Sequence, residues 1–132
     1  MHWDYVDDEG LILIRFTHPQ LILALGPTST LSAECPCEIS TGGQIIRTQA
    51  GTEPSRATQD TLDALTKSPA ASVTIDKKGT LELRSQSNDW LRLTGGGPWE
   101  SWSFNAPDGS KVVCLADAEL AVWGPAKPVG DS

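Results

Sequence analysis

Three cysteines and two histidines are the residues of this chain whose types best suit metal binding. Zinc sites commonly use four nitrogen or sulfur ligands, so a site here would have to gather Cys35, Cys37, Cys114 and His18. Their spacing matches no zinc finger or knuckle, and Cys114 lies in an apolar run that is typical of a core strand. A disulfide between Cys35 and Cys37, two positions apart, would be strained. We therefore expect free thiols, no metal and no other cofactor.

The histidines are also poorly placed for acid–base catalysis. A Ser-His-Asp arrangement needs a supported imidazole and a nucleophile exposed on a sharp turn. His2 lies beside a chain end that we expect to fray, and His18 precedes Pro19 in a predicted turn. The sequence contains no Gly-x-Ser-x-Gly motif. We predict no catalytic residues.

The densest acidic run of the sequence comprises Asp4, Asp7, Asp8 and Glu9. Paired carboxylates perform acid–base chemistry when their surroundings push their pKa values apart, which a solvated turn does not do. The run also lacks the ligand spacing of a calcium-binding loop. We interpret it as a solvated turn. The alternative is a contact with a basic partner through Asp7, Asp8 and Glu9.

Two further carboxylates, Glu100 and Glu119, are predicted to lie beside tryptophans. Side chains alternate between the two faces of a strand, which places Glu100 on the face of Trp102 and Glu119 on that of Trp123. Each carboxylate is either held beside an indole in a pocket or placed at the rim of a surface, and we favour the rim. Trp99 shares its face with serines and is predicted to be exposed. Because large aromatic residues anchor binding surfaces, Trp99, Glu100, Trp102 and Glu119 are candidate binding residues.

The stretch 90–123, which positions these candidates, is predicted to form consecutive antiparallel strands. It holds four of the five tryptophans, and the turn signals at 95–98 and 107–109 interrupt its apolar runs. Trp102 and Phe104 fall on one strand face, and we expect both in the core.

The same stretch resembles the C-terminal part of a family of small, uncharacterised bacterial proteins. The matching motifs are Trp99-Glu100-Ser101-Trp102, Pro107-Asp108-Gly109, Val112-Val113-Cys114 and Glu119-Leu120-Ala121-Val122-Trp123. The rest of the chain agrees with the family only in its order of strands and one helix. Trp99 replaces a usual Tyr, and Asp117-Ala118 replaces a usual Gly-Gly turn. The resemblance implies a common fold and no activity.

Upstream, short apolar runs predict further strands. The runs 11–16 and 21–25 have strand length, and the second is expected to be central in its sheet. The segment 31–39 is predicted to be an edge strand, because Pro36 lacks a backbone donor. We predict a mainly β (α+β) domain covering residues 1–132: an antiparallel meander rolled into a barrel or a sandwich, with one short helix packed on it.

The polar segments are assigned to loops, apart from one helix. Residues 40–57 are rich in Gly, Thr, Gln and Ser and are predicted to form a flexible loop, and residues 125–132 a disordered tail. Residues 57–67 are the helix candidate, with Thr58 as the N-cap. A helix this short is not stable alone in water, so it must lie on the sheet.

Charge and composition limit the partners. The formal net charge is −7 and the pI is about 4.6, which argues against nucleic acid as a partner. It is compatible with a basic protein partner, and equally with acidity that only maintains solubility. No signal peptide pattern is visible, and no apolar run approaches the roughly 20 residues of a membrane span. With three cysteines and hence one unpaired thiol, we expect a cytoplasmic protein without membrane contact.

The leading hypothesis is a non-enzymatic protein-interaction domain, and one partner it would suit is a basic toxin or effector of the kind that immunity proteins bind. The alternative is a small-molecule-binding β-barrel, or an enzyme with a site at the barrel mouth that uses Glu100, Glu119 and Trp102. An apolar cavity with a buried carboxylate would favour the alternative. A filled interior and a flat acidic and aromatic patch would favour the interaction domain. The sequence leaves the oligomeric state open.

Overall fold

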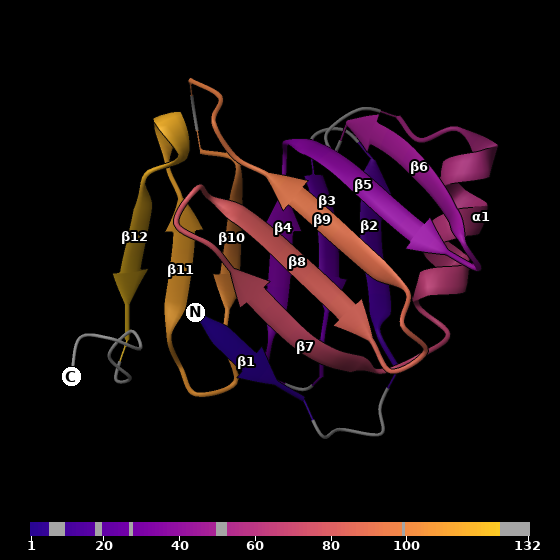
Figure 1. Ribbon diagram of the computed structural model, residues 1–132, viewed down its shortest axis with the longest axis horizontal. Helices are drawn as coiled ribbons and strands as arrows, with labels where there is room; N and C mark the ends of the chain where they lie inside the picture. The colour runs from indigo at the N-terminus through magenta and orange to yellow at the C-terminus, as the bar shows by residue number, and fades with distance from the viewer. Residues whose placement is uncertain (6–9, 18–19, 27, 50–52, 99, 125–132) are drawn as a thin grey trace.

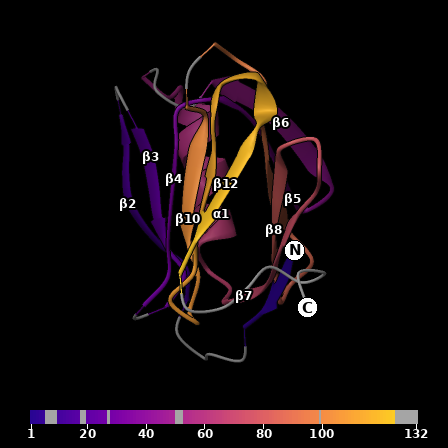
Figure 2. The same cartoon turned by 90° about the vertical axis from the view of Figure 1, so that its left-hand side faces the viewer.

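The computed structural model describes residues 1–5, 10–17, 20–26, 28–49, 53–98 and 100–124. In this part of the chain, two six-stranded antiparallel sheets lie face to face (Figures 1 and 2). The mainly β, antiparallel fold with one packed helix is confirmed. Of the two predicted architectures, the sandwich is correct, because the sheets remain two separate layers and do not close into a barrel.

Sheet A contains the strands in the spatial order β1-β7-β8-β9-β5-β6. Their bounds are β1 (His2–Asp4), β7 (Ala70–Ile75), β8 (Thr80–Ser85), β9 (Trp90–Thr94), β5 (Pro36–Thr41) and β6 (Gln44–Gln49).

Sheet B has the order β12-β11-β10-β4-β3-β2. Its strands are β12 (Leu120–Trp123), β11 (Lys111–Cys114), β10 (Trp102–Asn105), β4 (Thr30–Ala33), β3 (Gln20–Ala24) and β2 (Ile12–Thr17). A short 3-10 turn, η1 (Ala116–Ala118), joins β11 to β12.

The core lies between the sheets and is built by alternation along each strand. In β8, Leu81 and Leu83 are fully buried, whereas Glu82 and Arg84 face outward. The predicted core residues Trp102, Phe104 and Cys114 are all buried, as expected. Leucines from both sheets fill the remaining interior: Leu21, Leu23, Leu31, Leu81, Leu83, Leu91 and Leu93.

The expected edge strand over 31–39 is wrong, because this segment crosses from one sheet to the other. β4 ends at Ala33 in sheet B, and β5 begins at Pro36 in sheet A, where it pairs with β6 on one side and β9 on the other. Pro36 is tolerated in an interior strand because it is the first residue. Pairing with β9 starts only at Cys37, so the missing N–H of Pro36 removes no bond between these strands.

The predicted flexible loop over 40–57 is also largely wrong. Ser40 and Thr41 complete β5, and a two-residue turn follows in which Gly42 and Gly43 have φ of 58° and 84°. Positive φ at both positions is the type I′ geometry that suits the twist of two paired strands, and glycine adopts it without steric cost. The chain returns as β6, so only a short part of the segment is left for a connection. Residues 50–52 and the predicted tail 125–132 lie outside the described residues.

The helix α1 (Arg56–Leu65) begins one residue before the predicted segment 57–67, and its N-cap lies three positions before the predicted one. Ser55 is the N-cap, since its hydroxyl accepts the backbone N–H of Thr58 at 3.2 Å. Thr58, the predicted N-cap, instead lies buried within the first turn. The buried face, which includes Leu62 and Leu65, packs on β5 and β6. Figures 1 and 2 show α1 between the two layers at this end of the sandwich.

Polar and aromatic contacts also join the layers away from the helix. The Trp102 indole N–H donates to the carbonyl of Gly79 in the β7–β8 turn at 2.9 Å. The hydroxyls of Tyr5 and Ser29 lie 3.1 Å apart. The rings of Trp3 in sheet A and Phe104 in sheet B meet edge to face, with centroids 5.2 Å apart.

Candidate functional site: the outer face of sheet A

A row of six polar side chains crosses the outer face of sheet A from edge to edge. Each residue is directly opposite the next in the strand register, so all six point to the same side. We call it the cross-strand row. It consists of Arg47, Glu38, Arg92, Glu82, Thr74 and His2, from β6, β5, β9, β8, β7 and β1.

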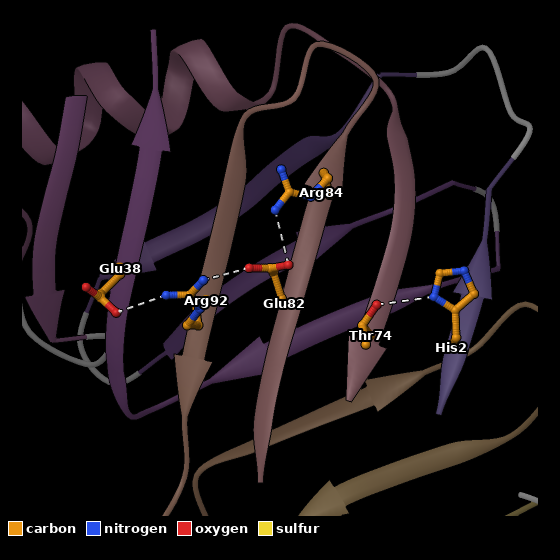
Figure 3. Close-up of polar contacts among 6 residues, drawn as sticks. All are labelled: His2, Glu38, Thr74, Glu82, Arg84 and Arg92. Carbon is orange, nitrogen blue, oxygen red and sulfur yellow. Dashed lines mark hydrogen bonds and ion pairs between the residues drawn. The ribbon is translucent and has the colours of Figure 1, made fainter. Parts of the chain in front are cut away.

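Ion pairs link the first four members of the row. Arg47 Nε lies 2.9 Å from Glu38 Oε2, and Arg92 Nη2 lies 2.8 Å from Glu82 Oε1. Arg92 Nη1 is 3.7 Å from Glu38 Oε1, and Arg84 adds a contact of 3.3 Å to Glu82 Oε2 (Figure 3). Exposed pairs of this kind each contribute about 0–1 kcal/mol to stability, so the network contributes more to the ordering of its side chains than to the fold.

Trp90 lies beside the cross-strand row and stacks on Arg92, one of its members. It is opposite Arg84 on β8 and Ser40 on β5, and it is only half-buried. The guanidinium carbon of Arg92 lies 4.5 Å from the centroid of the Trp90 ring, a cation–π contact. The indole and the guanidinium therefore fix each other's position on an open surface.

The charges of this surface are mixed. The ion-pair network of Arg47, Arg84, Arg92, Glu38 and Glu82 sums to 3 − 2 = +1, whereas Asp4 and Asp76 add negative charge on the same face. Each guanidinium carries five N–H donors, more than these contacts use. The Arg47 side chain is 76% exposed. The surface can therefore donate further hydrogen bonds to a bound molecule.

A depression of about 240 Å³ lies where the row meets the β7–β8 turn. Its lining residues are Thr74, Asp76, Thr80, Glu82 and Arg92. Asp76 Oδ1 accepts the backbone N–H groups of Lys78 and Thr80, at 2.9 and 3.0 Å, which holds the turn in place. The lining combines hydroxyl, carboxylate and guanidinium groups.

At the far end of the row, His2 connects a hydroxyl with a carboxylate. Its Nδ1 lies 3.2 Å from Thr74 Oγ1, and its Nε2 lies 2.7 Å from Asp4 Oδ1. The expected fraying of this end is wrong, because β1 pairs with β7 and the terminal ammonium of Met1 donates to the carbonyl of Ile75. The His2 and Asp4 side chains are 53% and 75% exposed, so water screens the pair.

Comparison with known proteins gives one result. Residues 5–124 match the model of a family of unknown function, DUF6188. The chain belongs to this family. No curated protein and no solved structure matches it. The DUF6188 match includes the stretch 90–123, whose motifs carry the resemblance to an uncharacterised family. It also includes every member of the cross-strand row except His2.

Of the predicted binding residues of this DUF6188 chain, those that the structure describes are not part of the row. Trp102 is 1% exposed and belongs to the core, so it is not accessible to a partner. Glu100 is exposed at the end of sheet B, beside Ser32 and Ser103, and lines a depression of only about 20 Å³, which is room for about one water molecule. Glu119 is exposed after η1 and does not line that depression. Trp99, Asp7, Asp8, Glu9 and His18 lie outside the described residues.

Sequence reasoning did not select Glu38, Arg47, Trp90 or Arg92. The sequence does carry a signal for this face, because the outward positions of these strands hold charged residues between buried apolar ones. This alternation predicts a solvated sheet face, but it does not show which charged residues are neighbours. That depends on the pairing of β5 with β9, whose residues are far apart in sequence.

The three cysteines of the family member are free and buried. Within the described ranges, no group of three or more His, Cys, Asp or Glu residues is arranged to hold a metal ion. Burial is the main cause that raises the pKa of Cys35 from 9.0 to about 12, and the neighbouring Cys114 adds to the shift. Burial also raises the pKa of Cys37. No helix in the described part of the chain has the length and hydropathy to cross a membrane.

The raised thiol pKa values predict a loss of stability at alkaline pH. The folded protein retains the Cys35 proton, which the unfolded chain releases above about pH 9. The stabilisation is therefore complete below pH 9 and decreases as the pH rises towards 12. Urea unfolding across this range should show the decrease, and Cys35→Ala should reduce its slope. Thiolate absorbance that appears near pH 9 in the folded protein would contradict the prediction.

The apolar run around Cys114 indicated its burial, and the odd cysteine count indicated an unpaired thiol. The fold identifies a surface to be tested. Membership of the DUF6188 family indicates no activity.

Proposed function

We propose that this protein is a non-enzymatic interaction domain that binds another protein through the outer face of sheet A. The observation that carries the proposal is the ordered, partly exposed group of Arg47, Arg84, Arg92 and Trp90 on this face. Arginine and tryptophan are enriched among the residues that contribute most to protein–protein affinity. Because ion pairs and stacking already hold these side chains, a partner loses less conformational entropy in ordering them.

The partner that fits the whole molecule best is a basic protein, of the kind that immunity proteins neutralise. The formal net charge of −7 attracts a basic partner at long range and accelerates association. At short range, the spare N–H donors of Arg47 and Arg84 match carbonyl or carboxylate groups of the partner. Three buried free thiols are compatible with a reducing compartment such as the cytoplasm, where we place the protein.

A second candidate function has one observation in its favour. The depression lined by Thr74, Asp76, Thr80, Glu82 and Arg92 has nearly the size of a small-molecule site. It lies on a sheet face and not at a barrel mouth, and it is lined by polar groups. A ligand site here would therefore differ from the one expected around Glu100, Glu119 and Trp102.

The interaction hypothesis predicts that Trp90→Ala weakens partner binding about 30-fold or more, the effect of losing an aromatic hot spot. The partner is captured from the native cell, identified and purified, and its affinity is measured by calorimetry. Trp123→Ala is the matched control, because Trp123 is 54% exposed at the edge of the other sheet. Equal affinity for wild type and Trp90→Ala, or a loss confined to Trp123→Ala, would exclude this face as the interface.

A further inference from the structure

The depression beside the β7–β8 turn contains a set of hydrogen-bonding groups that the protein itself leaves unused. Asp76 uses Oδ1 for two backbone N–H groups, and no contact is recorded for its Oδ2 within the described part of the chain. The hydroxyl of Thr80 and Nε of Arg92 likewise make no hydrogen bond within the described part of the chain. An acceptor, a hydroxyl that donates or accepts, and a donor are therefore available together around a volume of about 240 Å³.

The charges around this volume oppose an anion most, because two carboxylates and one guanidinium line it. Asp76 and Glu82 would repel an anion, and Arg92 would repel a cation. Glu82 also has both carboxylate oxygens engaged, by Arg92 and by Arg84, so it does not bind a second cation without losing one of them. A neutral ligand meets no such opposition.

We propose that this depression binds a neutral sugar through two adjacent hydroxyl groups. One hydroxyl donates to Asp76 Oδ2, and its neighbour accepts from Arg92 and shares a hydrogen bond with Thr80. A hydroxyl both donates and accepts, which suits a lining of mixed donors and acceptors better than a group with a single role. The depression has room for one sugar ring.

The surrounding structure keeps the lining in place before a ligand arrives. Glu82 and Trp90 hold the guanidinium of Arg92, and the turn hydrogen bonds hold Asp76. Such preorganisation lowers the entropic cost of binding. The site is open to solvent on one side, so we expect a dissociation constant in the millimolar range, as is usual for a single sugar unit on an exposed surface. A longer glycan would gain affinity by also contacting the row.

The test is a titration of the full-length protein, followed by NMR, with glucose, galactose, mannose and N-acetylglucosamine, and with glucuronate and glucosamine as charged comparisons. At least one neutral sugar should bind saturably and more tightly than either charged sugar. Asp76→Asn keeps the turn acceptor and replaces the free acceptor by a donor. Thr80→Val removes the hydroxyl at nearly constant shape. Each should weaken binding about tenfold or more.

The matched control is Thr94→Val, because Thr94 lies opposite Thr80 on β9 and does not line the depression. It should leave sugar binding unchanged. Absence of saturable binding by every neutral sugar, tighter binding of a charged sugar, or an equal loss in Thr94→Val would overturn the proposal. The result is independent of the protein-interaction test, which uses Trp90 outside the depression and a protein ligand.

Discussion

Replacing Trp102 with alanine is expected to lower the free energy of unfolding by about 3–5 kcal/mol, the usual cost of truncating a fully buried tryptophan. Trp102 is 1% exposed and lies at the contact between the sheets, where its indole N–H reaches the carbonyl of Gly79. The alanine variant loses the apolar burial and leaves a cavity. It also removes the indole donor from the Gly79 carbonyl, which still accepts the backbone N–H of Gly95 at 3.1 Å.

Two variants separate these contributions in urea unfolding experiments. Trp102→Phe retains most of the apolar volume but removes the N–H donor, so its destabilisation should be smaller than that of Trp102→Ala. Trp123→Ala removes the same side chain from an exposed position and should change the free energy of unfolding by less than about 0.5 kcal/mol. Equal losses for Trp102→Ala and Trp123→Ala would show that Trp102 does not lie in the core.

Introducing a single methyl group at Gly95 is expected to destabilise the protein by about 1–3 kcal/mol, the range for overpacking a tight interior. A Cβ at this position would lie 2.3 Å from Cys114 Sγ and 3.1 Å from the carbonyl oxygen of Gly79. Real Cβ atoms do not approach another atom to 2.3 Å, so either the Cys114 side chain or the backbone around Gly95 must shift. Thermal and urea unfolding of Gly95→Ala measure the effect.

Cys114→Ala in the Gly95→Ala background provides the decisive comparison. Removing the sulfur opens the space that the new methyl group needs, so the double variant should lose less stability than the sum of the single variants. Gly97→Ala is the control, since no atom lies within 4 Å of the corresponding Cβ. Additive losses in the double variant would mean that Gly95 and Cys114 are not in contact.

Local pattern predicts the composition of the core but not the arrangement of the strands around it. The burial of Trp102 and Phe104 follows from alternation within one strand, and it is confirmed. Alternation does not reveal that β10 pairs with β4, a strand about seventy positions earlier in the sequence. For the same reason, the pattern allowed a barrel as well as a sandwich.

The candidate site was missed because it depends on such distant pairings. Glu38 becomes a neighbour of Arg92 only when β5 lies beside β9, and the sequence gives no register for that pair. The prediction for 31–39 failed for a related reason. A proline suggested an edge strand, whereas Pro36 occupies the first position of an interior strand. Carboxylates beside tryptophans were selected by alternation alone, and of these tryptophans Trp102 is buried in the core.

The crossings of the chain from one sheet to the other also determine how the protein unfolds. The polypeptide passes between the layers three times, from β1 to β2, from β4 to β5 and from β9 to β10. Neither layer is therefore a continuous piece of polypeptide, and no single cut releases one of them whole. Denaturation should therefore be a single cooperative transition, in which both sheets are lost together.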